Sequence, residues 1–161
     1  MEPRFDLNAN GLGARLGKRF AAASQLILES SLPFLTTELV SLRTSQINGC
    51  GFCADMHTKE AAAAGETSLR LNLVATWRES TVFTEPERAA LALAEEVTRF
   101  ADADAGVSEE AWSHAREHYD DDQLAALLYL IAMVNASNRL LVSTRTKGGA
   151  YEAGSLAPAP A

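Results

Sequence analysis

Several residue types are scarce in this sequence, and each shortage excludes a class of protein. Its two cysteines are too few for the disulfide framework that holds small secreted domains together. Aromatic residues make up 7% of the chain, and β-branched residues never form the alternating runs that are typical of strands. The longest apolar run, residues 124–134, is shorter than the about 20 residues that a membrane-spanning helix needs. We therefore interpret this run as a buried helix.

Positive charge is scarce as well. The chain has 14 basic and 21 acidic residues, which gives a formal net charge of −7. This excess of negative charge repels the phosphates of nucleic acids and anionic membrane surfaces. The first residues also lack the basic start and continuous apolar stretch of a secretory signal. We expect a cytoplasmic protein that binds neither nucleic acid nor membrane.

Helix-forming residues are abundant. The 161 residues, of which 47% are hydrophobic, are enough for one domain with its own core. Alanine, leucine and glutamate dominate the long segments, which favours α-helix over strand. Apolar spacing and capping residues predict an all-α bundle of about seven helices and no sheet. The helices are expected near residues 12–30, 36–47, 50–64, 67–77, 84–100, 108–119 and 121–141.

The end of the chain differs from the rest. Residues 148–161 have no apolar periodicity and are rich in glycine, alanine and proline. We therefore expect a helical domain at residues 1–147 and a mobile tail at 148–161 that can be deleted without loss of the fold. Apolar residues surround more than one face of residues 124–134, and this pattern predicts a homo-oligomer in which a second copy covers them.

Cys50, Cys53 and His57 form the motif with the clearest chemistry. On a helix their spacing places all three on one side, directly after the break at Asn48-Gly49. The N-terminus of a helix lowers the pKa of a thiol, and an imidazole can accept and return its proton. Two neighbouring thiols can also close into a disulfide. This motif predicts thiol redox chemistry.

Other interpretations of the polar residues remain open. The two cysteines could be small core residues, or they could bind zinc together with His57 and a carboxylate. Structural zinc sites usually draw ligand pairs from separated segments, and the chain has no second pair of this kind, so we expect no metal and no cofactor. We interpret His114 and His118 as part of a solvated helix face. The polar residues of the apolar last helix are assigned a structural role or a subunit contact: Asn135, Asn138 and Arg139.

Residues 38–58 closely resemble the signature of the carboxymuconolactone decarboxylase family, in its alkylhydroperoxidase (AhpD-like) branch. The resemblance implies an all-helical homo-oligomer (dimer, trimer or hexamer) that reduces small hydroperoxides through the cysteine pair. The catalytic roles that it implies fall on Cys53 and Cys50, with Glu38 and His57 as proton relay. The similarity covers most of residues 36–142 and continues through residues 64–67, 77–80, 83–85, 88–92 and 135–139.

The sequence also departs from the pattern of this branch. Phe52 stands between the cysteines, where the best-known alkylhydroperoxidases have a histidine, so one proton-transfer group is missing. Because His57 lies one helical turn from Cys53, we predict that Cys53 attacks the peroxide and Cys50 resolves the product. An external dithiol or protein donor would then restore both thiols. The alternatives are a redox sensor or binding module that uses the same disulfide, and a decarboxylase-like lactone enzyme.

Overall fold

The computed structural model describes residues 2–102 and 106–155. Every regular element in this part of the chain is helical, which confirms the predicted all-α class. Two short 3₁₀ segments accompany the α-helices. The elements are α1 (Gly11–Leu28), α2 (Phe34–Asn48), α3 (Gly51–Ala63), α4 (Ser68–Leu73), η1 (Val74–Glu79), α5 (Glu85–Thr98), η2 (Phe100–Asp102), α6 (Glu109–His118) and α7 (Asp121–Thr144).

The boundaries of the helices follow capping chemistry. Thr84 caps α5 in a capping box, and Asp120 caps α7 in the same way. The expected helix at residues 67–77 is divided into α4 and the 3₁₀ segment η1, and within η1 the backbone of Thr76 leaves the helical region (φ −121°, ψ 30°). Val74 and Trp77 of η1 are both buried.

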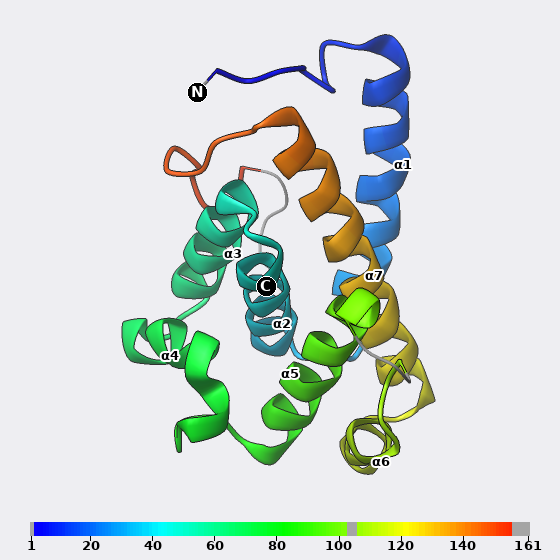
Figure 1. Ribbon diagram of the computed structural model, residues 1–161, viewed down its shortest axis with the longest axis vertical. Helices are drawn as coiled ribbons and strands as arrows, with labels where there is room; N and C mark the ends of the chain where they lie inside the picture. The colour runs from blue at the N-terminus through cyan, green and yellow to red at the C-terminus, as the bar shows by residue number, and fades with distance from the viewer. Residues whose placement is uncertain (1, 103–105, 156–161) are drawn as a thin grey trace.

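Helix α2 lies in the centre of the molecule and packs against α3, α5 and α7 (Figure 1). On one side, apolar residues of α2, α5 and α7 form a core that includes Val40, Leu93 and Ile131. On the other side, α2 packs with η1 and α5 around Leu39 and Trp77. The central position of α2 brings its polar residues into the interior, between α3 and α7.

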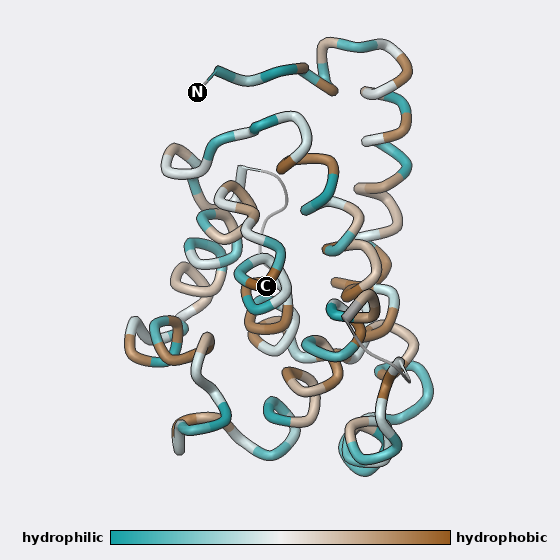
Figure 2. Tube along the Cα trace, in the orientation of Figure 1, coloured by the Kyte–Doolittle hydropathy of each residue, from teal (hydrophilic) through white to brown (hydrophobic). Residues whose placement is uncertain are grey.

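Helix α7 is long and apolar enough to span a membrane by length and composition alone, and 39% of its most apolar 18-residue stretch is buried. Figure 2 shows this apolar character and the contrasting hydrophilic α6. Because the buried residues of α7 pack against α1, α2 and α5, its arrangement is that of a core helix. Apolar side chains nevertheless remain exposed on α1 and α7: Leu12, Leu16, Leu26, Tyr129, Leu140 and Val142.

The described part of the expected tail, residues 148–155, contacts α3. The Asp55 carboxylate accepts hydrogen bonds from the backbone N–H groups of Gly149 and Tyr151, at 2.6 and 3.1 Å. The hydroxyl of the buried Tyr151 donates to Glu60. These contacts differ from the expectation of a tail without packing. The division at residue 147 stays a prediction, and residues 156–161 lie outside the described residues.

Candidate active site

The turn between α2 and α3 positions the cysteine pair. Gly49 has a φ of 67°, in the left-handed region that glycine adopts without a steric penalty. The N–H of Cys50 then donates to the carbonyl of Ser45 at 2.9 Å, which closes the end of α2. The chain reverses here, so α3 runs back along α2 and Cys50 becomes the N-cap residue of α3.

Both cysteines are reduced and almost fully buried, with 2% and 1% of their surface exposed. The backbone N–H of Cys53 donates to the sulfur of Cys50 at 3.4 Å. Hydrogen bonds from the Cys53 thiol, and then from its backbone, lower the pKa of Cys50 to about 6, although burial opposes this shift. The pKa of Cys53 is raised, because its thiol donates to Cys50 and because burial disfavours a second charge. These contacts favour a thiolate on Cys50 over one on Cys53.

Glu38 and His57 meet across the two helices. The Nδ1 atom of His57 lies 2.8 Å from Oε2 of Glu38, and the two side chains are only 12% and 8% exposed. A carboxylate accepts hydrogen bonds, so the neutral ring carries its proton on Nδ1, which leaves Nε2 as the basic nitrogen. The positive charge of a protonated His57 also lowers the pKa of Cys50. The catalytic roles of both residues stay proposals.

Phe52, the residue between the cysteines, takes no part in this polar arrangement. Its ring meets that of Tyr151 edge to face, with 6.1 Å between the ring centres. Phe52 thus packs against the C-terminal segment and supplies no proton-transfer group.

A polar network on α7, which the sequence analysis did not connect with the cysteines, completes the site. Asn138 is fully buried, and its Nδ2 donates to Oγ of Ser45 at 3.1 Å. Its Oδ1 accepts from Nδ2 of Asn48 at 2.9 Å. Hydrogen bonding by Asn138 lowers the pKa of both thiols. Because Asn138 is fully buried within one copy of the chain, it cannot take part in a subunit contact, and the structural role remains. The one sequence signal was an amide in an apolar helix.

No group of three or more histidine, cysteine, aspartate or glutamate side chains in the described residues is arranged to hold a metal ion. The rings of His114 and His118 lie edge to face, 5.1 Å apart. His114 lies 3.7 Å from the exposed Glu85.

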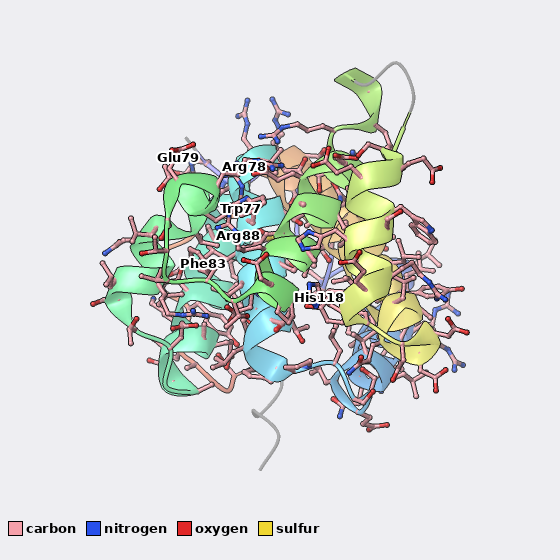
Figure 3. All side chains as sticks on the ribbon, turned by 90° about the horizontal axis from the view of Figure 1, so that it is seen from below. Trp77, Arg78, Glu79, Phe83, Arg88 and His118 are labelled. Atoms are coloured by element: carbon pink, nitrogen blue, oxygen red, sulfur yellow. The ribbon has the colours of Figure 1, made fainter. Side chains whose placement is uncertain are left out.

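A separate cluster surrounds the buried carboxylate of Glu95. Arg43 donates to it at 2.6 Å and the indole N–H of Trp77 at 3.1 Å. Burial raises the pKa of Glu95, but Arg43 and its other partners outweigh this and leave the pKa below its ordinary value. Arg78 also donates to Glu95, and it stacks on the Trp77 ring beside Arg88 (Figure 3). This cluster connects α2, η1 and α5 and contains no nucleophile.

The fold and the site define an all-helical protein whose C-x-x-C pair begins a helix beside a glutamate–histidine pair. The chain belongs to the carboxymuconolactone decarboxylase family, whose profile matches residues 14–96. The uncharacterized Bacillus subtilis protein YdfG is 38% identical over 115 residues, which cover 71% of this chain and 77% of YdfG.

Two solved structures extend the comparison. An Agrobacterium tumefaciens protein of unknown function, described as a candidate antioxidant defence protein AhpD, is 33% identical with a TM-score of 0.85. The similarity covers 93% of this chain and all of that protein. An uncharacterized peroxidase-related protein from Silicibacter sp. TM1040 has a TM-score of 0.74 over 93% of this chain and 78% of its own. At 21% identity, this second likeness shows the fold alone.

Proposed function

We propose that this protein is a thiol-dependent peroxidase that reduces small hydroperoxides through Cys50 and Cys53. The observation that carries the proposal is the position of Cys50 at a helix N-terminus, where its sulfur accepts the N–H of Cys53, on the helix whose His57 pairs with Glu38. Hydrogen bonds from Cys53 lower the pKa of Cys50 to about 6, against the effect of burial. A thiol with this pKa is mostly thiolate at neutral pH, and the thiolate is the nucleophile. The description of the Agrobacterium relative as a candidate antioxidant protein supports the same class of chemistry.

The reaction proceeds in three steps. The thiolate attacks one oxygen of the hydroperoxide, the O–O bond breaks, and the sulfur becomes a sulfenic acid. The leaving alkoxide takes a proton from the His57–Glu38 relay and departs as an alcohol. The second thiol then attacks the sulfenic acid, so that a disulfide forms and water leaves. An external dithiol or protein donor supplies two electrons and two protons to restore both thiols. No step requires a bound cofactor or metal.

The assignment of the attacking sulfur differs from the sequence-based prediction. Proximity to His57 favours Cys53, whereas the helix N-terminus and the hydrogen bonds of the pair favour a thiolate on Cys50. The same contacts raise the pKa of Cys53. We therefore assign the attack to Cys50 and the resolving role to Cys53. Because both sulfurs are almost fully buried, a small oxidant reaches them most readily.

A redox sensor that uses the same disulfide is the second candidate. It is favoured by Phe52, which packs on Tyr151 and leaves the site with one proton-transfer group fewer than the best-known alkylhydroperoxidases have. A sensor is oxidised once and does not turn over. Peroxide consumption with dithiothreitol as reductant therefore separates the two functions. The peroxidase proposal expects rapid turnover for the wild type, slower turnover for Cys53→Ser, whose sulfenic acid only dithiothreitol can reduce, and almost none for Cys50→Ser. A sensor rapidly consumes one equivalent and then continues only at the slow rate at which dithiothreitol reduces its disulfide.

The exposed apolar side chains of α1 and α7 support a further part of the proposal. Tyr129 and Leu26 are each 69% exposed, and such large apolar groups are covered when copies of a chain associate. We propose a cytoplasmic homo-oligomer (dimer, trimer or hexamer) in which these helices contribute to the contact between copies.

A further inference from the structure

We propose that Asn138, on α7, is a residue that holds the reactive sulfur in place: its side-chain N–H group donates to the cysteine pair and stabilises the thiolate. The inference rests on the proposed thiol chemistry. It concerns the state of the thiols themselves, which can be measured without any peroxide.

The orientation of the Asn138 amide is fixed at both ends. Its oxygen accepts from Nδ2 of Asn48, at 2.9 Å, and its nitrogen donates to Oγ of Ser45, at 3.1 Å. A side-chain amide has two N–H donors, so one remains for a further acceptor. Asn48 and Ser45 belong to the turn that carries Cys50, since the Ser45 carbonyl also accepts from the N–H of Cys50. Hydrogen bonding by Asn138 to both thiols accounts for this second donor.

A second layer of hydrogen bonds prevents the amide from flipping. Nδ2 of Asn48 also donates to Oδ1 of Asn135, at 2.9 Å, and that oxygen accepts from Arg139 at 3.0 Å as well. The nitrogen of Asn135 donates to Thr98 on α5 at 3.1 Å. Reversing any of these amides would face donor with donor or acceptor with acceptor. The network thus connects α2, α5 and α7 and fixes the orientation of the Asn138 amide.

The surroundings of Asn138 make its donor effective. The residue has no exposed surface, and each cysteine is at most 2% exposed. In such a site a hydrogen bond to a charged acceptor is stronger than in water, because water does not compete for the thiolate. The pKa directions agree, since hydrogen bonding by Asn138 lowers the pKa of both thiols.

This role separates Asn138 from a residue that only stabilises the fold. Replacing an amide that only stabilises the fold would lower the free energy of unfolding and leave the pKa of the thiols unchanged. An amide that stabilises the thiolate favours the reduced pair over the disulfide, which makes the disulfide easier to reduce. Its removal should raise the pH midpoint of thiol ionisation and lower the reduction potential.

The test is the pH dependence of alkylation by iodoacetamide in reduced full-length protein. The wild-type midpoint is expected near pH 6. Asn138→Leu keeps the size of the side chain and removes its hydrogen-bond donors. The alkylation midpoint should therefore rise by about one pH unit, and the fraction of thiolate below the midpoint should fall about tenfold. Thr144→Val is the matched control, because Thr144 is also buried on α7 and, among the described residues, its hydroxyl bonds only to its own helix and Thr146. An unchanged midpoint in folded Asn138→Leu would overturn the inference.

A measurement on the wild type keeps the inference testable if the variant does not fold. The side-chain amide signals of Asn138 in an ¹⁵N–¹H spectrum should shift with pH at the midpoint of thiol ionisation, and signals that do not titrate would contradict the contact. A shifted alkylation midpoint in a protein that turns over no peroxide would refute the peroxidase and leave the role of Asn138 intact. Peroxide turnover with an unshifted midpoint would refute the role of Asn138 alone.

Discussion

The carboxylate of Glu38 and the imidazole of His57 are joined by a 2.8 Å hydrogen bond across the α2–α3 pair. The bond uses Nδ1 of the ring and so determines its tautomer and orientation. In the proposed reaction this arrangement makes His57 the group that delivers a proton to the leaving alkoxide. Glu38 stabilises the ring when it is protonated.

His57→Ala should therefore reduce peroxide turnover more than it changes the thiols. Loss of a positioned acid or base costs about 10²-fold or more in rate. The charge of His57 is the smallest of the named influences on the pKa of Cys50, so the alkylation midpoint should rise only slightly. Glu38→Gln should show a milder loss of turnover, because the amide can still orient the ring. Glu79→Gln, at an exposed carboxylate, is the control. Equal losses in all three variants would argue against a relay.

The two cysteines should differ when each is replaced by serine. In Cys53→Ser, one equivalent of peroxide should leave a sulfenic acid on Cys50, because the helix N-terminus and the backbone N–H of the substituted residue still stabilise its thiolate. In Cys50→Ser, Cys53 loses the thiol partner that contributes most to its raised pKa, but burial still raises that pKa, so Cys53 should react slowly. Dimedone labelling followed by mass spectrometry identifies the modified residue. Rapid labelling of Cys53 in the Cys50→Ser variant would restore the sequence-based assignment.

The cluster around Glu95 should make the fold sensitive to acid. The pKa of Glu95 in the folded protein is below its ordinary value of 4.5, despite the opposing effect of burial, because Arg43 and its other partners stabilise the charge. This stabilisation is present above the unfolded pKa and is lost as the pH falls through the lower, folded one. Glu95→Gln should cost about 3 kcal/mol at pH 7, because Arg43 loses its partner in a buried site. Urea unfolding at pH 7 and at pH 4 measures both effects. A variant whose stability falls with acid as steeply as the wild type would contradict this role.

The sequence predicts the helices and the cysteine–histidine motif because both depend on local patterns. Thr84 marks the start of α5 by its own capping box, and the spacing of Cys50, Cys53 and His57 on one helix determines their common side. The partners of Asn138 could not be predicted in this way, because they lie 90 and 93 residues earlier in the chain. Periodicity describes which face of a helix is buried, and it carries no information on which distant polar group the face meets.

Tyr151 illustrates the same limit at the C-terminus, and it provides a prediction. A single buried aromatic with backbone hydrogen bonds leaves no periodic signal, yet its hydroxyl donates to the buried Glu60. Tyr151→Ala should lower the free energy of unfolding by about 2–4 kcal/mol, because it removes a buried ring and one of the hydrogen bonds to the buried Glu60 carboxylate. Thermal unfolding measures this, with Glu152→Ala, at an exposed neighbour, as control. Equal stability of the two variants would support a dispensable tail.

The exposed apolar residues of α1 and α7 give the last prediction, which concerns assembly. Leu16 is 61% exposed and Tyr129 is 69% exposed, and monomers rarely leave many such groups in water. If copies of the chain cover these residues, light scattering should return a multiple of 17.2 kDa over a wide range of concentrations. A carboxylate that is buried in the contact between two copies loses its hydration, which weakens the contact. Leu16→Glu or Tyr129→Glu should therefore shift the protein towards the monomer. Leu69→Glu, at a residue that is 58% exposed on α4, serves as the control for an added charge elsewhere. Both cysteines are buried within a single copy of the chain, so the pH midpoint of their alkylation should be the same in the monomer and in the oligomer. A wild type that scatters as 17.2 kDa at every concentration would refute the oligomer and leave the thiol chemistry untouched.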